Sequence, residues 1–196
     1  MIFDDPRQEN IDKHLFATPG HHAYAVVDGA ALPGLLPRLY NYPADYCCLF
    51  RGELLPELAA MAPYLIKLEQ YTPITEWLLN SKDSHPGIFS VIPDALDFNA
   101  VHTHFRRFLR VSGPDNQALY FRYYDPRVMS EYLPSCPPQQ ARTVFGPVQY
   151  YLLEDPEQHT RLYWVGSDGV GHRSLMPVAE STSSLAPESK REKVTC

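Results

Sequence analysis

The sequence lacks an apolar run that approaches the roughly 20 residues needed to span a bilayer. Residues 1–6 include two aspartates and have neither the basic stretch nor the apolar stretch of a secretory signal. We therefore expect a cytoplasmic protein with no membrane span.

Positive charge is also scarce. The 17 lysines and arginines are outnumbered by 23 aspartates and glutamates, which gives a formal net charge of -6. A nucleic-acid platform needs clustered cations to neutralise phosphates, so we expect no nucleic-acid partner. The negative balance favours solubility and gives no attraction to an anionic membrane.

The four cysteines do not form a recognisable framework. Cys47 and Cys48 are adjacent, Cys136 is isolated and Cys196 is the last residue. This spacing matches neither a zinc knuckle nor a disulfide-rich scaffold. Cys47 and Cys48 lie in an apolar run, where a free cysteine usually behaves as a small buried hydrophobic residue.

Signatures of catalysis and cofactor binding are missing. The chain has no Gly-x-Ser-x-Gly, P-loop, Gly-x-Gly-x-x-Gly or His-Glu-x-x-His pattern. His102 and His104 are two residues apart, so on a helix they point to different faces and do not share one metal ion. We therefore expect no metal and no cofactor.

The remaining enzymatic option is a pair of aspartates at predicted strand ends, Asp28 and Asp125, because active sites of α/β proteins collect there. The alternative is that each one caps a turn or a helix. Asp28 precedes Gly29, and Asp125 precedes Pro126 in the order typical of a helix start.

Apolar residues make up 44% of the chain, which is enough for a packed core. The 19 prolines are spread along the sequence, so the elements should be short. Helices are predicted at residues 8–17, 30–39, 53–61, 74–79 and 94–110, and short helices or turns at residues 128–132 and 138–144. Strands are predicted at residues 22–28, 46–50, 64–68, 87–92, 116–124, 148–154 and 161–165.

This alternation predicts an α/β (mixed α+β) fold, with a central mixed β-sheet flanked by short helices. Residues 1–148 are expected to form the main lobe, and residues 149–176 a short extension with a β-hairpin. Its strands are the predicted strands 148–154 and 161–165, and a further hairpin turn is predicted at Asp168 and Gly169. Residues 177–196 are rich in Ser, Glu and Lys and lack aromatics, so we expect a disordered tail.

The most distinctive segment is residues 119–127, Leu-Tyr-Phe-Arg-Tyr-Tyr-Asp-Pro-Arg. Strand alternation would place Arg122 and Tyr124 on one face. Arginine beside tyrosine is typical of protein interfaces, because the planar groups stack and hydrogen-bond. An internal ion pair of Asp125 with Arg122 or Arg127 is the other interpretation, and both remain open.

Six short motifs, in the right order, resemble the adaptor chaperones of type VI secretion effectors. These proteins are often called Tap or TEC adaptors, and their domain was once described as being of unknown function. The motifs lie at residues 24–30 (Tyr-Ala-Val-Val-Asp-Gly-Ala), 49–52 (Leu-Phe-Arg-Gly), 62–68 (Ala-Pro-Tyr-Leu-Ile-Lys-Leu), 105–111 (Phe-Arg-Arg-Phe-Leu-Arg-Val), 121–127 (Phe-Arg-Tyr-Tyr-Asp-Pro-Arg) and 145–147 (Phe-Gly-Pro).

The resemblance implies a mixed α/β lobe without catalysis. Such a protein holds a toxic effector in the bacterial cytoplasm and delivers it to the VgrG spike, so the implied partners are an effector and VgrG. Members of the family often have a longer, variable C-terminal lobe than residues 148–196 provide. This chain is thus either a minimal adaptor or one that works with a further partner.

Within these motifs, Arg122, Tyr124 and Arg127 are the candidates for protein contact. Turn and cap positions are instead expected to maintain the fold: Asp28, Gly29, Pro63, Tyr64, Asp125, Pro126, Gly146 and Pro147. Two other functions stay open: an immunity-like protein that neutralises a basic toxin, and a hydrolase that uses the strand-end aspartates.

Overall fold

The computed structural model describes residues 6–81, 86–113, 115–154 and 159–175. The predicted tail from residue 177 lies outside the described residues. The helices are α1 (Pro6–Phe16), α2 (Leu35–Asn41), α3 (Pro56–Ala60), α4 (Pro73–Asn80), α5 (Phe98–Arg106), the 3₁₀ turn η1 (Arg107–Leu109), α6 (Pro126–Ser135) and α7 (Pro138–Phe145). The strands are β1 (His21–Asp28), β2 (Tyr46–Cys48), β3 (Pro63–Leu68), β4 (Gly87–Pro93), β5 (Arg110–Ser112), β6 (Ala118–Tyr120), β7 (Tyr150–Glu154), β8 (Thr160–Gly166) and β9 (Gly169–Ser174).

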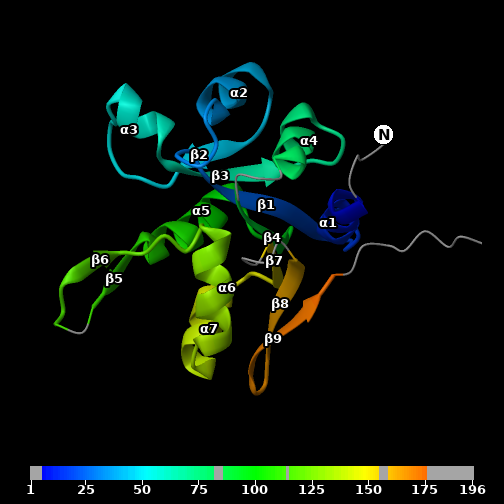
Figure 1. Ribbon diagram of the computed structural model, residues 1–196, viewed down its shortest axis with the longest axis vertical. Coiled ribbons are helices and arrows are strands. Elements are labelled where there is room, and N and C mark those ends of the chain that lie inside the picture. The colour runs from blue at the N-terminus through cyan, green and yellow to red at the C-terminus, as the bar shows by residue number, and fades with distance from the viewer. Residues whose placement is uncertain (1–5, 82–85, 114, 155–158, 176–196) are drawn as a thin grey trace, which may run out of the picture.

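Seven of these strands form one sheet in the order β2-β3-β1-β4-β7-β8-β9 (Figure 1). The predicted α+β class is confirmed. Every described strand pair is antiparallel, so the parallel pairs expected of a mixed sheet do not occur among the described strands. The reason is that β3 and β4 both return along β1 from its carboxyl end, where Asp28 lies opposite Pro63 and Val27 opposite Gly87.

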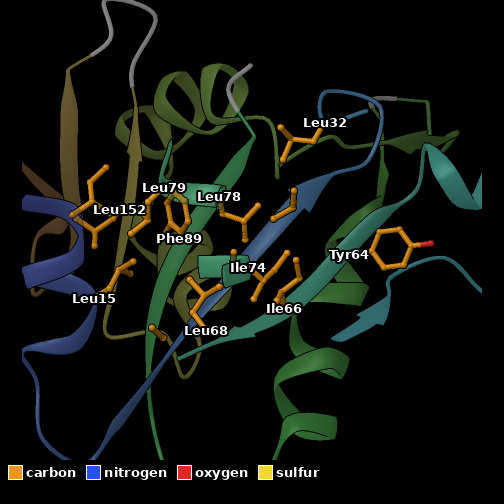
Figure 2. Close-up of a cluster of buried hydrophobic side chains, with 14 of the residues drawn as sticks. Leu15, Leu32, Tyr64, Ile66, Leu68, Ile74, Leu78, Leu79, Phe89 and Leu152 are labelled. Carbon is orange, nitrogen blue, oxygen red and sulfur yellow. The ribbon is translucent and has the colours of Figure 1, made fainter. Parts of the chain in front are cut away.

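The central strands β1, β3 and β4 are buried on both faces, as the continuous apolar pattern of residues 87–92 predicts. Side chains of β1 alternate between two cores: Ala25 packs in the first and Val26 in the second. Helices α1, α2 and α4 contribute to the first core, part of which Figure 2 shows. Helices α5, α6 and α7 contribute to the second core, so the fold has three layers.

Two predicted helices begin later than their sequence pattern indicates. The helix predicted from residue 94 begins at Phe98, because the Asp97 carboxylate accepts a hydrogen bond from Ala100 N (2.7 Å) and caps it. The helix predicted from residue 30 begins at Leu35. Gly34 precedes it with a left-handed φ of 88°, and the backbone of residues 29–34 turns instead.

The predicted C-terminal hairpin is present, and it extends the central sheet. Strand β7 pairs with β4, with Leu152 opposite Phe89, and β8 and β9 follow in order. The turn between β8 and β9 lies where Asp168 and Gly169 predict it, and Gly169 has a φ of +128°. Residues 150–174 therefore share the hydrophobic cores of the sheet rather than standing apart from them.

Candidate functional site

The segment that the sequence singles out, residues 119–127, is a strand only up to Tyr120. Beyond it the chain turns, and Asp125 N donates a hydrogen bond to Arg122 O (3.0 Å). The predicted alternation of side chains between two faces of a strand is wrong for residues 121–124. Two consecutive side chains, those of Tyr123 and Tyr124, are both buried. The turn leads directly into α6, so its side chains are fixed by the core below them.

At this turn, Arg122 forms an ion pair with Asp28, the last residue of β1. The Arg122 Nη2 to Asp28 Oδ2 distance is 2.5 Å, and Asp28 Oδ1 also accepts a hydrogen bond from Ala30 N (3.0 Å). The Asp28 side chain is only 3% exposed, whereas that of Arg122 is 49% exposed. Burial of a carboxylate is costly unless it is paired and hydrogen-bonded, and Asp28 has both kinds of partner. The hydrogen bond from Arg122 to Asp28 in turn raises the pKa of Arg122.

Asp125 is the N-cap of α6, with Pro126 in the first helical turn. Its carboxylate accepts hydrogen bonds from Arg127 N (3.0 Å), Arg127 Nε (3.0 Å) and Arg127 Nη2 (2.8 Å). Burial opposes ionisation of Asp125, but these bonds outweigh it and lower the pKa of the carboxyl group. Asp28 and Asp125 are thus each paired with an arginine. The pair of Asp125 with Arg127 is one of the internal ion pairs that the sequence allows.

Of the three candidates for protein contact, Arg122 and Arg127 present exposed guanidinium groups. Tyr124 is 3% exposed. Its ring lies under Arg122, 5.9 Å from ring centroid to guanidinium carbon, and its hydroxyl is 3.4 Å from that of Tyr120. This geometry gives Tyr124 a supporting position beneath Arg122, and its use in direct contact stays a prediction.

Gly29 lies where two backbone segments approach closely. A Cβ atom at this position would be 2.6 Å from Ala60 O and 2.7 Å from Ala62 O. The Gly29 N–H also donates to Ala62 O (3.1 Å), just before β3 begins at Pro63. The absence of a side chain therefore permits this contact between the end of β1 and the start of β3.

The remaining candidates for maintaining the fold occupy similar contacts. The Tyr64 hydroxyl donates to Ala59 O (2.8 Å), which ties β3 to the end of α3. Gly146 ends α7 with a φ of +50°, and a Cβ there would be 2.5 Å from the His104 ring. Pro147 follows, half-buried, in the turn to β7.

A groove of about 460 Å³ lies next to the Asp28–Arg122 ion pair, because Tyr120 lines the groove and contacts Tyr124. Its lining residues come from the chain around α3, the end of α5 with η1, and the β5–β6 hairpin; α3 and the hairpin both lie on the left of Figure 1. Six of its lining residues are apolar or aromatic, and we call them the floor: Leu49, Phe50, Leu54, Leu58, Leu109 and Tyr120. The other four are arginines, and we call them the rim: Arg51, Arg106, Arg107 and Arg110. We refer to these ten residues as the arginine-rimmed groove.

Tyr120 connects the groove to the cluster around Asp28. Its ring packs edge-on against Phe50, with 5.8 Å between ring centroids, and its hydroxyl faces that of Tyr124. Sequence reasoning missed the groove. The available signals were the leucines at positions 54 and 55 before Pro56 and the closely spaced arginines of residues 106–110.

The profile of a family described as a domain of unknown function (DUF4123) matches residues 23–143, which is more than half of the chain. The chain belongs to this family. The DUF4123 match begins in β1 and ends in α7, so it includes Asp28, Arg122, Arg127 and the whole arginine-rimmed groove. No curated protein and no solved structure matches the chain significantly.

Within its described residues, the DUF4123 protein has no cluster of three or more His, Cys, Asp or Glu side chains that would hold a metal ion. His102 and His104 instead each lie within hydrogen-bond distance of a backbone carbonyl: that of Cys48 for His102 and that of Val144 for His104, both at 3.1 Å. No helix in the described segments is both long and apolar enough to cross a membrane.

Proposed function

We propose that this protein is a non-catalytic adaptor that binds a type VI secretion effector in the bacterial cytoplasm and helps to load it onto the VgrG spike. The observation that carries the proposal is the family match over residues 23–143. Five of the six adaptor-like motifs lie inside this range, and the sixth follows at residues 145–147.

The state of the two aspartates supports a binding role over a hydrolytic one. A general base must be available to accept a proton from the substrate or water. Asp28 is buried and paired with Arg122, and Asp125 is committed to Arg127 and to the start of α6. Their hydrogen bonds maintain local structure, and such an arrangement leaves little capacity for acid–base chemistry.

The surface next to these aspartates supports the recognition of another protein. The groove has apolar residues on its floor and arginines on its rim, a composition typical of interface centres. The rim arginines come from the chain before α3 (Arg51), from the end of α5 and η1 (Arg106 and Arg107) and from β5 (Arg110). The β5–β6 hairpin and the chain around α3 extend from the main sheet (Figure 1).

The test is recovery of the tagged full chain from a lysate of its own bacterium, with mass spectrometry of the proteins that accompany it. We expect a toxin-like effector or a spike protein, and we expect Arg127→Glu to weaken effector capture while thermal melting stays normal. Recovery of the bait alone, where a known adaptor retains its cargo, would contradict the proposal. Wild-type capture by a normally melting Arg127→Glu variant would remove Arg127 from the interface.

A gene deletion separates the adaptor from the immunity-like alternative. Loss of an adaptor should leave the effector in the producing cell but stop its delivery to target cells. Loss of an immunity protein should instead poison the producing cell and leave delivery intact. Delivery and survival are therefore measured together in the deletion strain and in the complemented strain.

A further inference from the structure

We infer that the arginine-rimmed groove binds a segment of the partner protein in which apolar side chains are flanked by aspartates or glutamates. The inference rests on the proposed function, because it presumes a protein partner. It adds the chemistry of the segment and the place where it binds.

Apolar side chains are left uncovered at this groove. Helix α3 has no buried residue, although a surface helix normally buries an apolar face. Leu58, which lines the groove, is 44% exposed, and its neighbours Leu55 and Met61, outside the lining, are 73% and 54% exposed. Contiguous exposed apolar surface in a water-soluble domain usually indicates a binding site, so we expect this one to be covered by apolar groups of a partner.

The charges on the rim define which partner would bind. Arg51, Arg106, Arg107 and Arg110 form no ion pair with a carboxylate in the described part of the chain, whereas Arg122 and Arg127 do. This local concentration of unpaired positive charge occurs in a chain with a net charge of -6. Charge complementarity therefore favours carboxylates at the rim and disfavours a basic segment.

Two of the rim arginines are already held in position. Arg106 Nη2 donates to Phe50 O (3.0 Å), and Arg107 Nη2 donates to Thr143 O (2.7 Å) while its guanidinium lies over the Phe108 ring. Each of these bonds uses one of the five N–H donors of a guanidinium. The Nε of Arg106 is buried, so the donors left for a carboxylate are on the Nη groups of Arg106 and on Arg107, at low cost in side-chain ordering.

Arginines also bind nucleic-acid phosphates, but the floor of the groove favours a protein segment. Single-stranded nucleic acid is bound on aromatic side chains along which bases stack. Four of the six floor residues are leucines: Leu49, Leu54, Leu58 and Leu109. The net charge of -6 would also repel a polyanion at long range.

The binding segment is identified by photo-cross-linking of the full chain in its own bacterium. A photoreactive phenylalanine replaces Leu58 on the floor of the groove, and a control chain has it at Tyr71, which is 64% exposed in the turn before α4. We expect position 58, and not position 71, to cross-link to a partner segment with apolar residues next to aspartate or glutamate. A cross-linked segment that is basic, a second copy of this chain, or nucleic acid would overturn the inference.

Charge variants then test the rim. The double variant Arg51→Glu, Arg110→Glu should weaken partner binding by about tenfold or more. The single variants Arg110→Glu and Arg173→Glu form the matched pair, because Arg173 is exposed on β9 at the far edge of the sheet. Only Arg110→Glu should weaken binding, and replacing the facing partner carboxylate by arginine should restore it. All chains are first compared by thermal melting.

The outcomes separate the two proposals. If wild-type chain retains its partner and the rim variants bind equally well, the groove inference fails and the adaptor function stands. The same holds if position 58 gives no cross-link while the partner is still recovered. If wild-type chain recovers no partner protein, the adaptor function fails, and the inference that depends on it fails too.

Discussion

Asp28 and Arg122 are 94 residues apart in the sequence and form an ion pair with a 2.5 Å Nη2–Oδ2 distance. The pair joins the turn after β1 to the connection between β6 and α6. Tyr124 lies under the guanidinium and contacts Tyr120 of the groove. The ion pair thus holds the exposed Arg122 in place. Through Tyr124, it also supports Tyr120 at the edge of the groove.

Removal of Arg122 should destabilise the fold, because the buried Asp28 would lose its charged partner. We expect Arg122→Ala to lower the free energy of unfolding by about 2 kcal/mol. The control is Arg127→Ala, which should cost less than about 1 kcal/mol, since Arg127 is exposed and its backbone N–H still bonds to Asp125. Urea denaturation measures both values, and equal losses would contradict the structural role of the Asp28 pair.

A methyl group at position 29 should be poorly tolerated. Its nearest neighbours would be the backbone oxygens of Ala60 and Ala62, which cannot move without shifting the start of β3. We expect Gly29→Ala to cost more than about 2 kcal/mol of unfolding free energy. The control Gly166→Ala has no neighbour closer than 3.8 Å at its Cβ and should stay within about 1 kcal/mol of wild type.

Acid should destabilise the protein through His104. Burial, reinforced by the nearby Arg107, lowers the pKa of His104 from 6.5 to about 4, although its hydrogen bond to Val144 O opposes the shift. The unfolded chain therefore binds more protons between pH 4 and 6.5. Stability is full above pH 6.5 and falls as the pH drops toward 4, by about 3 kcal/mol in total for this residue.

The variant His104→Gln isolates this effect, because glutamine does not titrate and still has a donor for Val144 O. Urea denaturation at several pH values from 4 to 7 should show a shallower pH dependence for His104→Gln than for wild type. His21→Gln, at an exposed hydrogen bond, should keep the wild-type slope. Identical slopes in all three chains would exclude His104 as the source.

Tyr123 and Tyr124 provide a matched pair for buried hydroxyl groups. The Tyr123 hydroxyl donates to Phe105 O at 2.9 Å, whereas the Tyr124 hydroxyl lies 3.4 Å from the Tyr120 hydroxyl. Tyr123→Phe leaves a buried carbonyl without this donor, so it should cost about 1 kcal/mol or more. Tyr124→Phe should cost less. Chemical denaturation compares them, and the reverse order would contradict the assigned hydrogen bonds.

Local patterns predicted most of the architecture. The apolar runs of β1, β3 and β4 and the Asp125–Pro126 start of α6 all correspond to observed elements, because they depend on neighbours within a few residues. The strand predicted for residues 116–124 ended early for a tertiary reason. Arg122 turns toward Asp28, and the ring of Tyr123 is taken into the core beside Phe105.

The candidate site was predicted only in part. Residues 119–127 were singled out because arginines, tyrosines and an aspartate occur together there. The pairing of Asp125 with Arg127 is local and was among the possibilities, whereas the pairing of Arg122 with Asp28 depends on distant segments. The groove was missed because its floor and rim come from residues 49–58, 106–110 and 120.

The sequence by itself determined most of the elements, the caps of α5 and α6 and the family, because periodicity, turn residues and short motifs are properties of neighbouring residues. The tertiary structure decided that all described strand pairs are antiparallel, and that four arginines line one groove together with four leucines. Such contacts form between residues far apart in the chain. They are set by which apolar faces bury each other, and no local pattern encodes that choice.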